Sequence, residues 1–84
     1  MSLVDDISAA RIATALERVG PRLKGLRTQR GLTLTGVSAS TGISKSTLSR
    51  LETGQRRPTL ELLLALSHTY RVPLDDLVGA AAGG

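Results

Sequence analysis

The segment 44–53, SKSTLSRLET, combines short hydroxyl side chains with two long cations. At about 100° per residue, Leu48 and Leu51 define the buried side of a helix, and Lys45 lies at its margin. Four residues project from the opposite side: Ser46, Ser49, Arg50 and Thr53. Small hydroxyl residues let a helix backbone approach closely, and Lys and Arg can reach guanine edges or phosphates. Because this face carries no acid, the pattern favours a helix that enters the major groove of DNA.

Glu52 is the one acid in this segment, and it lies on the inner side of the predicted helix. It projects about 40° from Leu48, at the boundary of the core. An unpaired carboxylate there would be costly, so Glu52 requires a partner. Arg27, on the preceding predicted helix, is the candidate, because a guanidinium can hold a carboxylate with two hydrogen bonds. The alternative is a weak, exposed ion pair.

Capping residues predict the helices that position this segment. Thr33 is a candidate N-cap for a short helix that carries Leu34 and Val37, and Gly42 supplies a tight turn after it. Ser44 caps the next helix, which ends at Gly54. Thr59 begins the helix 59–70, which is apolar over most of its circumference and is expected in the core.

Both ends of the chain also contain helical patterns. Residues 5–19 place apolar side chains at mostly helical intervals behind two aspartates. Gly20 and Pro21 are expected to interrupt this helix, with Pro21 beginning a second helix that buries Leu23 and Leu26 and stops at Gly31. A short helix follows Pro73. The segment 1–19 is therefore predicted to be a separate N-terminal helix, used for dimerisation or packed on its own domain.

Composition limits the fold to one small all-α domain. The chain has 84 residues, no cysteine, and Tyr70 as its single aromatic residue. No disulfide or thiolate metal site is possible, and the core must consist of aliphatic residues. No strand pattern, internal repeat or heptad series is evident. We predict a compact five- or six-helix bundle, with residues 20–79 forming the main domain and residues 80–84 a flexible tail.

Charge is concentrated in the middle of the chain. Residues 20–58 contain eight basic residues and one acid, whereas the flanking segments contain three basic and six acidic residues. A basic centre between acidic ends suggests one surface that binds a polyanion. The alternative is a solvated basic face without a ligand.

Other classes of function have weaker support. His68, Asp75 and the many serines allow a Ser-His-Asp set on paper, but no Gly-x-Ser-x-Gly elbow accompanies them, and we expect no enzyme. No metal site, cofactor site or glycine-rich phosphate loop is predicted. No apolar run approaches the roughly 20 residues that span a bilayer, and the acidic N-terminus is unlike a secretory signal. We therefore expect a cytoplasmic protein.

Four sequence segments together resemble a known family. They are LRTQRG, the turn TGIS, the segment SKSTLSRLETG and the basic loop QRRP, within a span from about Gly20 to Gly79. This span resembles the phage repressor and Cro-type helix-turn-helix regulators, the XRE family, over roughly 60 of the 84 residues. The resemblance implies a lambda-repressor-like DNA-binding domain with its helix-turn-helix at about residues 33–53.

The resemblance also assigns roles to individual residues. It implies base contacts by Lys45, Ser46, Ser49 and Arg50. It implies phosphate contacts by Thr33, Ser44, Thr47, Gln55, Arg56 and Arg57. The buried Arg–Glu pair of the family falls on Arg27 and Glu52, in agreement with the helical wheel.

Two residues depart from the family pattern. Leu34 replaces the glutamine that binds phosphate and braces a base-reading residue, and Ser38 replaces an alanine. The loss of that glutamine shifts the expected phosphate binding to backbone amides at the helix N-terminus and to Arg56 and Arg57.

The resulting functional prediction is sequence-specific transcriptional regulation, as a repressor, by a homodimer on double-stranded palindromic DNA. Regulators with a similar STLSRLE segment carry a C-terminal sensor domain, frequently a cupin, so the chain is expected to be a fragment or a stand-alone version of such a protein. The alternative is a protein-interaction module of the same shape, such as an antitoxin or adaptor, which would expose an apolar patch in place of the basic one.

Overall fold

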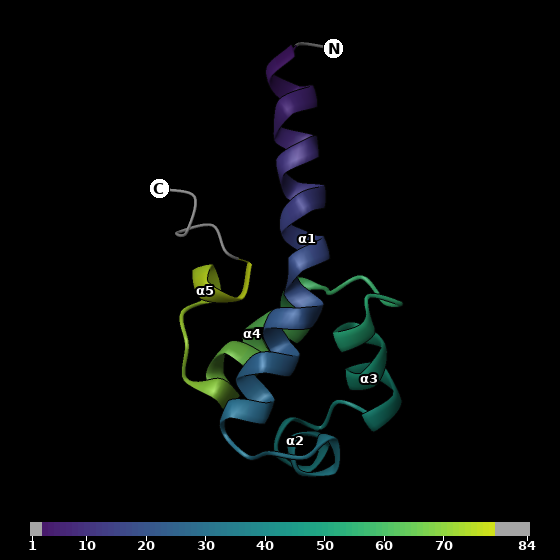
Figure 1. Cartoon of the computed structure of the whole chain (residues 1–84), viewed down its shortest axis with the longest axis vertical. Coiled ribbons are helices and arrows are strands. Elements are labelled where there is room, and N and C mark those ends of the chain that lie inside the picture. Colours follow the sequence, from purple (N-terminus) through teal and green to yellow (C-terminus); the bar gives the residue numbers. More distant parts are fainter. Residues whose placement is uncertain (1–2, 79–84) are drawn as a thin grey trace.

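The computed structural model describes the backbone of residues 3–78 and the side chains of residues 12–78. Within this range the chain forms five helices and no strand (Figure 1). They are α1 (Leu3–Gln29), α2 (Leu34–Thr41), α3 (Lys45–Thr53), α4 (Leu60–Tyr70) and α5 (Leu74–Val78). The predicted all-α fold is therefore confirmed. The predicted tail, residues 80–84, lies outside the described residues.

The long helix α1 is the centre of the arrangement. Its C-terminal half packs against α3 and α5, while α2 contacts both α3 and α4 (Figure 1). Its N-terminal half projects beyond the other helices. A helix of 27 residues is about 40 Å long, which accounts for most of the 44 Å length of the molecule.

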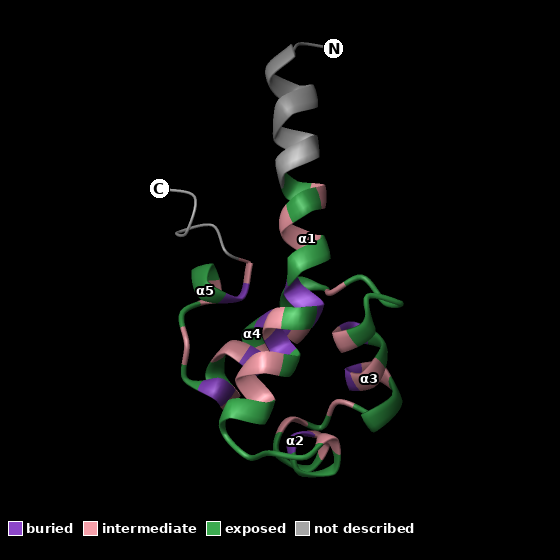
Figure 2. Cartoon of the chain, in the orientation of Figure 1, coloured by how far each residue is buried: buried purple, intermediate pink, exposed green. Residues whose placement is uncertain are grey.

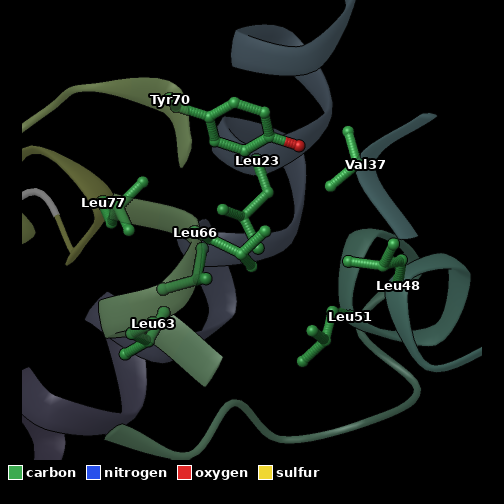
Figure 3. Packing of buried hydrophobic residues seen from close by; sticks show 9 residues of the cluster. Leu23, Val37, Leu48, Leu51, Leu63, Leu66, Tyr70 and Leu77 are labelled. Carbon is green, nitrogen blue, oxygen red and sulfur yellow. The ribbon is translucent and has the colours of Figure 1, made fainter. Parts of the chain in front are cut away.

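All five helices contribute to a single core of aliphatic residues around Tyr70 (Figure 3). Leu66 and Leu77 are at most 1% exposed, so α4 and α5 are anchored at the centre of this cluster. Burial of each such leucine contributes about 1.5–3 kcal/mol. The complete set of buried residues is Val19, Leu23, Val37, Leu48, Leu51, Leu63, Leu66, Tyr70 and Leu77.

The predicted caps begin and end the central helices. Thr33 Oγ1 accepts the Gly36 N–H at 3.0 Å at the start of α2. Ser44 and Thr59 accept the N–H of the third residue after them at 3.2 Å, at the starts of α3 and α4. Three glycines follow the C-termini of α1, α2 and α3 with positive φ, where a side chain would be strained: Gly31, Gly42 and Gly54.

The predicted break at Gly20 and Pro21 is wrong, because α1 continues through both residues. Val19 and Leu23, one helical turn apart, are only 1% and 2% exposed, so a continuous helix buries both. Pro21 lies on the exposed side of α1. There water can hydrate the backbone carbonyl that loses its helical hydrogen bond to proline. Burial of Val19 and Leu23 stabilises the folded chain by about 1.5–3 kcal/mol per side chain. This offsets the cost of about 3 kcal/mol for a proline inside a helix.

Gly20 marks a close approach between helices instead of a helix end. A Cβ atom at this position would lie 2.7 Å from the carbonyl oxygens of both Leu51 and Glu52. Real Cβ atoms do not approach backbone oxygens so closely. The absence of a side chain at Gly20 therefore lets α1 contact the last turn of α3, and this contact sets how closely the two helices pack.

Candidate nucleic-acid interface

The orientation of α3 matches the helical wheel. Leu48 and Leu51 are 3% and 2% exposed, whereas Lys45 and Arg50 are exposed to solvent. Of the serines in the same predicted base-contacting set, Ser46 is exposed and Ser49 is half-buried. The first turn of α3 contains no acidic residue. The outer side of α3 thus presents hydroxyl groups and cations, beside the positive end of the helix dipole.

A hydroxyl network organises the start of α3. Ser44 Oγ accepts the Thr47 N–H at 3.2 Å and donates its own proton to Thr47 Oγ1 at 2.8 Å. Thr47 Oγ1 acts as an acceptor here, so its hydroxyl proton is free for another acceptor. The cap leaves the backbone N–H groups of Lys45 and Ser46 without partners inside the helix. Three donors therefore lie at the start of α3, where the positive end of the helix dipole favours an anion such as a phosphate.

The start of α2 shows the consequence of having Leu34 in place of the glutamine of the family pattern. Leu34 is half-buried and packs against the core, so this residue stabilises the fold and offers no donor. The exposed Thr33 caps the helix through the Gly36 N–H. Ser38 is half-buried, and its carbonyl accepts the Gly42 N–H at 2.9 Å. Polar groups at this end of α2 are thus the hydroxyls of Thr33 and Thr35 and the backbone amides of the first turn.

The basic loop after α3 is attached to that helix through its backbone. The N–H groups of Gln55 and Arg56 both donate to the Arg50 carbonyl, at 2.9 and 3.2 Å. The side chains of Gln55, Arg56 and Arg57 are all exposed. These hydrogen bonds hold the two loop arginines next to the C-terminal end of α3, on the same part of the molecule as Arg50.

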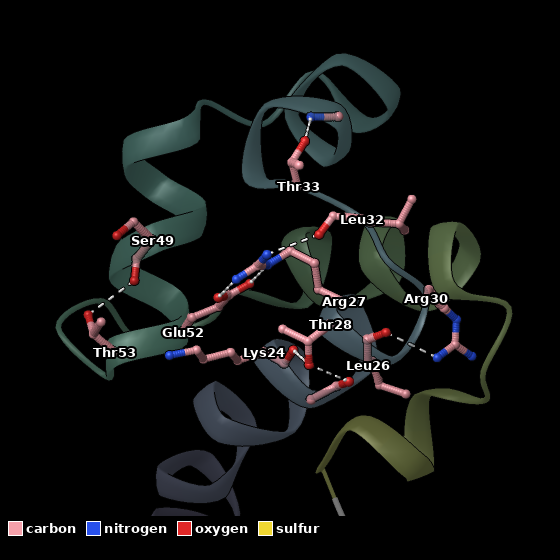
Figure 4. A network of polar contacts seen from close by, with 12 residues as sticks. Lys24, Leu26, Arg27, Thr28, Arg30, Leu32, Thr33, Ser49, Glu52 and Thr53 are labelled. Carbon is pink, nitrogen blue, oxygen red and sulfur yellow. Dashed lines mark hydrogen bonds and ion pairs between the residues drawn. The ribbon is translucent and has the colours of Figure 1, made fainter.

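The Arg27–Glu52 pair forms with two hydrogen bonds (Figure 4). Arg27 Nε lies 2.7 Å from Glu52 Oε2, and Arg27 Nη2 lies 2.9 Å from Glu52 Oε1. The two side chains are only 14% and 7% exposed, so the pair is not the weak surface contact of the alternative interpretation. The hydrogen bond to Glu52 raises the pKa of Arg27 above its ordinary value. The pair joins the C-terminal part of α1 to α3.

Pairing of Glu52 leaves the central segment with cations alone at its surface. Glu52 is the single acid in residues 20–58, and its carboxylate is occupied by Arg27. Seven of the eight basic residues of this segment are therefore not neutralised by an acid of the same segment. Such an excess attracts a polyanion and makes its binding sensitive to salt.

Two features of this region were missed at the sequence level. Arg27 also donates through Nη1 to the Leu32 carbonyl at 3.0 Å, so it fixes the turn before α2 as well as α3 (Figure 4). Gly20 sets the approach of α1 to α3. Neither contact has a local signal, because both connect residues to backbone carbonyls whose position depends on the fold. The Gly-Pro pair instead favoured a break.

The residues proposed on paper for catalysis are not assembled. His68 is exposed near the end of α4, and within residues 12–78 its side chain makes no hydrogen bond to a serine or an aspartate. Over the same range there is no group of three or more acidic, histidine or cysteine side chains that could hold a metal ion. In the described part of the chain, no helix is both long and apolar enough to span a bilayer.

Sequence comparison finds relatives that are named as transcriptional regulators. Residues 23–77 match the helix-turn-helix family HTH_3. The chain is 42% identical over 57 residues to the HTH-type transcriptional regulator DdrOP3 of Deinococcus deserti, across 68% of this chain and 44% of that protein. It is 40% identical over 62 residues to the transcriptional regulator ClgR of Mycobacterium tuberculosis, across 74% of this chain and 55% of that protein. The chain thus spans about half the length of these two regulators.

Two of the solved structures with a similar fold are a controller protein and a gene regulator. The restriction-modification controller protein C.AhdI of Aeromonas hydrophila superposes with a TM-score of 0.70 at 31% identity, over 74% of this chain and 94% of that one. The clp gene regulator ClgR of Corynebacterium glutamicum superposes with a TM-score of 0.73 at 30% identity, over 82% of this chain and 73% of that one.

Proposed function

The chain belongs to the helix-turn-helix family HTH_3, and from that premise we propose that it is a transcriptional regulator that binds double-stranded DNA sequence-specifically. In this proposal α3 enters the major groove. Lys45, Ser46, Ser49 and Arg50 contact base edges. Backbone phosphates are bound by Thr33, Ser44, Thr47, Gln55, Arg56 and Arg57. The relatives named as transcriptional regulators support this assignment.

The outer face of α3 carries the proposal. Its exposed side chains include two cations and no acid, and the one acid of the helix pairs with Arg27 on the inner side. A helix that merely faced solvent would be expected to carry both signs of charge. Burial of Leu48 and Leu51 holds this face outward, and the Arg27–Glu52 pair and the Gly20 contact hold α3 against α1. Such a rigid support is needed for base recognition, because hydrogen bonds to base edges depend on position.

Three finer points belong to the same proposal. A palindromic site requires two copies of α3 about one helical turn apart, so we expect a homodimer on DNA. We expect repression as the regulatory outcome, no catalytic activity and a cytoplasmic location. Because the chain spans about half of the two regulators named above, a further sensor domain would belong to a longer protein.

The proposal is tested by selecting duplexes from a random pool at two salt concentrations. Enrichment of one sequence, with affinity that falls steeply as salt rises, is the expected result. Salt-sensitive binding without enrichment would identify a nonspecific polyanion binder. If no duplex binds in dilute buffer, the protein-interaction alternative replaces the DNA-binding proposal.

Two substitutions separate base contacts from phosphate contacts. Arg50→Ala should reduce the preference for the selected site over random DNA by about 1–3 kcal/mol. Arg56→Ala should weaken binding to all sequences alike and reduce the salt slope by about one phosphate. Arg18→Ala removes another exposed cation, from α1, and is the matched control, with no expected change in either quantity. An unchanged site preference in Arg50→Ala contradicts the assignment of α3 to base recognition.

A further inference from the structure

The continuity of α1 creates an apolar stripe that a break at Gly20 would have divided. Ile12, Leu16, Val19, Leu23 and Leu26 follow one another at alternating intervals of four and three residues. This spacing places all five on one side of a helix, as in the seam between two packed helices. The heptad pattern was missed at the sequence level because the two halves were assigned to different helices.

The two ends of this stripe differ in what covers them. At the C-terminal end, Val19 and Leu23 are buried in the core and Leu26 packs against it. Toward the N-terminus the cover of α1 decreases (Figure 2). Ile12 is 59% exposed. The stripe is thus continuous with the core but extends beyond the part of α1 that the other helices cover.

The face around Ile12 is apolar and has small flanks. Ala13 and Ala15 lie on either side of the line from Ile12 to Leu16. The polar residues of the same two turns project from the other side of α1: Thr14, Glu17 and Arg18. Alanine flanks allow a second helix to approach to about 8 Å. An uncharged face can meet a copy of itself without bringing like charges together.

We propose that the side of α1 that carries this face packs against the same side of a second copy of the chain, with Ile12 at the centre of the contact. The two α1 helices pack antiparallel, with the twofold axis passing near Ile12. This inference rests on the proposed function, which needs two α3 helices on one duplex. It assigns the contact to residues that precede the family match at residue 23.

The spacing that such a pair imposes is close to the spacing that DNA requires. Gly20 lies eight residues from Ile12, so the two Gly20 residues are about 24 Å apart along the helix axes. With an interaxial distance of about 8–10 Å, their separation is about 26 Å. The last turn of each α3 contacts α1 at Gly20. The separation of the two Gly20 residues is thus of the same order as one turn of B-DNA, about 34 Å, and each α3 is offset from its Gly20 by a further helix-packing distance of about 8–10 Å.

The mass of the protein in solution tests this contact without DNA. Two single helices form a small interface, so we expect a dimer that dissociates on dilution. In sedimentation equilibrium, the apparent mass should rise from 8.8 kDa to twice that value as the protein concentration is raised from roughly 10 μM to 1 mM. Ile12→Glu should stay at 8.8 kDa throughout. Leu64→Glu, which alters an apolar side chain of similar exposure on α4, should behave like the wild type.

A wild-type chain that stays monomeric over this range overturns the proposal, as does dissociation by Leu64→Glu in place of Ile12→Glu. DNA binding is measured separately. Ile12→Glu should bind a single half-site as the wild type does, and should lose about 10²–10⁴-fold in affinity for the two-site duplex. A wild-type dimer that binds no DNA contradicts the proposed function and supports the α1 contact.

Labels distinguish the antiparallel arrangement from a parallel one. The chain has no cysteine, so a single introduced cysteine is labelled alone. Spin labels on Lys24→Cys, twelve residues from Ile12, should be separated by about 36 Å or more in the antiparallel dimer. A parallel pair would bring them to within roughly 10–20 Å, which overturns the proposed geometry. Disulfide formation by Ile12→Cys, with none by Arg18→Cys on the opposite side, is the expected companion result.

Discussion

The helices α3 and α4 are consecutive in the chain and alike on the inside, but differ on the outside. Both begin at a hydroxyl cap and bury leucines in the same core. The outer side of α3 carries Lys45 and Arg50, with no acid in its first turn. The outer side of α4 carries Glu61 in its first turn together with Leu60 and Leu64, which are 61% and 51% exposed.

This difference shows that burial and binding are determined by separate sides of one helix. Both α3 and α4 bury leucines on their inner sides, so these residues specify the helical bundle and not the ligand. A polyanion is attracted to a helix N-terminus that no carboxylate neutralises, which is the condition of α3 and not of α4. Changes on inner sides should therefore alter folding free energy, whereas changes on the outer side of α3 should alter DNA binding.

The largest expected effect compares a buried with an exposed leucine. Leu51→Ala on α3 should lower the free energy of unfolding by about 2–5 kcal/mol, because it leaves a cavity beside α1. Leu64→Ala on α4 should change it by no more than about 0.5 kcal/mol. Urea unfolding followed by circular dichroism measures both. Equal losses would mean that the two helix faces are not distinguished by burial as described.

A second comparison concerns two glutamates. Glu52→Gln removes the charge that receives two hydrogen bonds from Arg27, and we expect a loss of about 1.5–3 kcal/mol in the free energy of unfolding. Glu61→Gln, on the exposed side of α4, should have little effect. Thermal unfolding of the two variants gives the difference. If Glu52→Gln unfolds with the same free energy as the wild type, the ion pair is not what holds α3 against α1.

The two caps separate folding from DNA binding most sharply. Ser44→Ala and Thr59→Ala each remove an N-cap, and each should lower the free energy of unfolding by about 1 kcal/mol. Only Ser44→Ala should also weaken DNA binding, because Ser44 orients the Thr47 hydroxyl. Titration of a selected duplex with both variants, under conditions where both are folded, measures this. Equal weakening by Thr59→Ala would place phosphate contacts at α4 as well.

The smallest effect at neutral pH comes from the inner side of α4. Burial raises the pKa of Tyr70 above its ordinary value near 10, whereas the inner leucines of α3, Leu48 and Leu51, do not ionise. The unfolded state then loses its tyrosine proton at lower pH than the folded state. The contribution of this pKa difference to the free energy of unfolding is therefore complete below about pH 10. It is lost as the pH rises through the pKa of Tyr70 in the folded state. Between about pH 8 and about pH 11, the free energy of unfolding should fall more for the wild type than for Tyr70→Phe.

Short-range signals made much of this molecule predictable from the sequence. Thr33, Ser44 and Thr59 cap the residues that immediately follow them, and Gly42 and Gly54 end helices by a property of their own backbone. The faces of α3 follow from the helical period. The Arg27–Glu52 pair could be predicted because a carboxylate that points toward the core needs a partner. Each of these depends on a few residues, or on one energetic requirement that any helical fold must meet.

The sequence by itself therefore determined where the central helices begin and end, and which side of α3 faces outward. Only the tertiary structure decided that α1 passes through Gly20 and Pro21 and that Arg27 also binds the Leu32 carbonyl. It also decided how far the apolar stripe of α1 remains uncovered at Ile12. The physical reason is that caps act over three or four residues. The fate of an internal proline or an apolar stripe instead depends on surfaces supplied by segments distant in the chain.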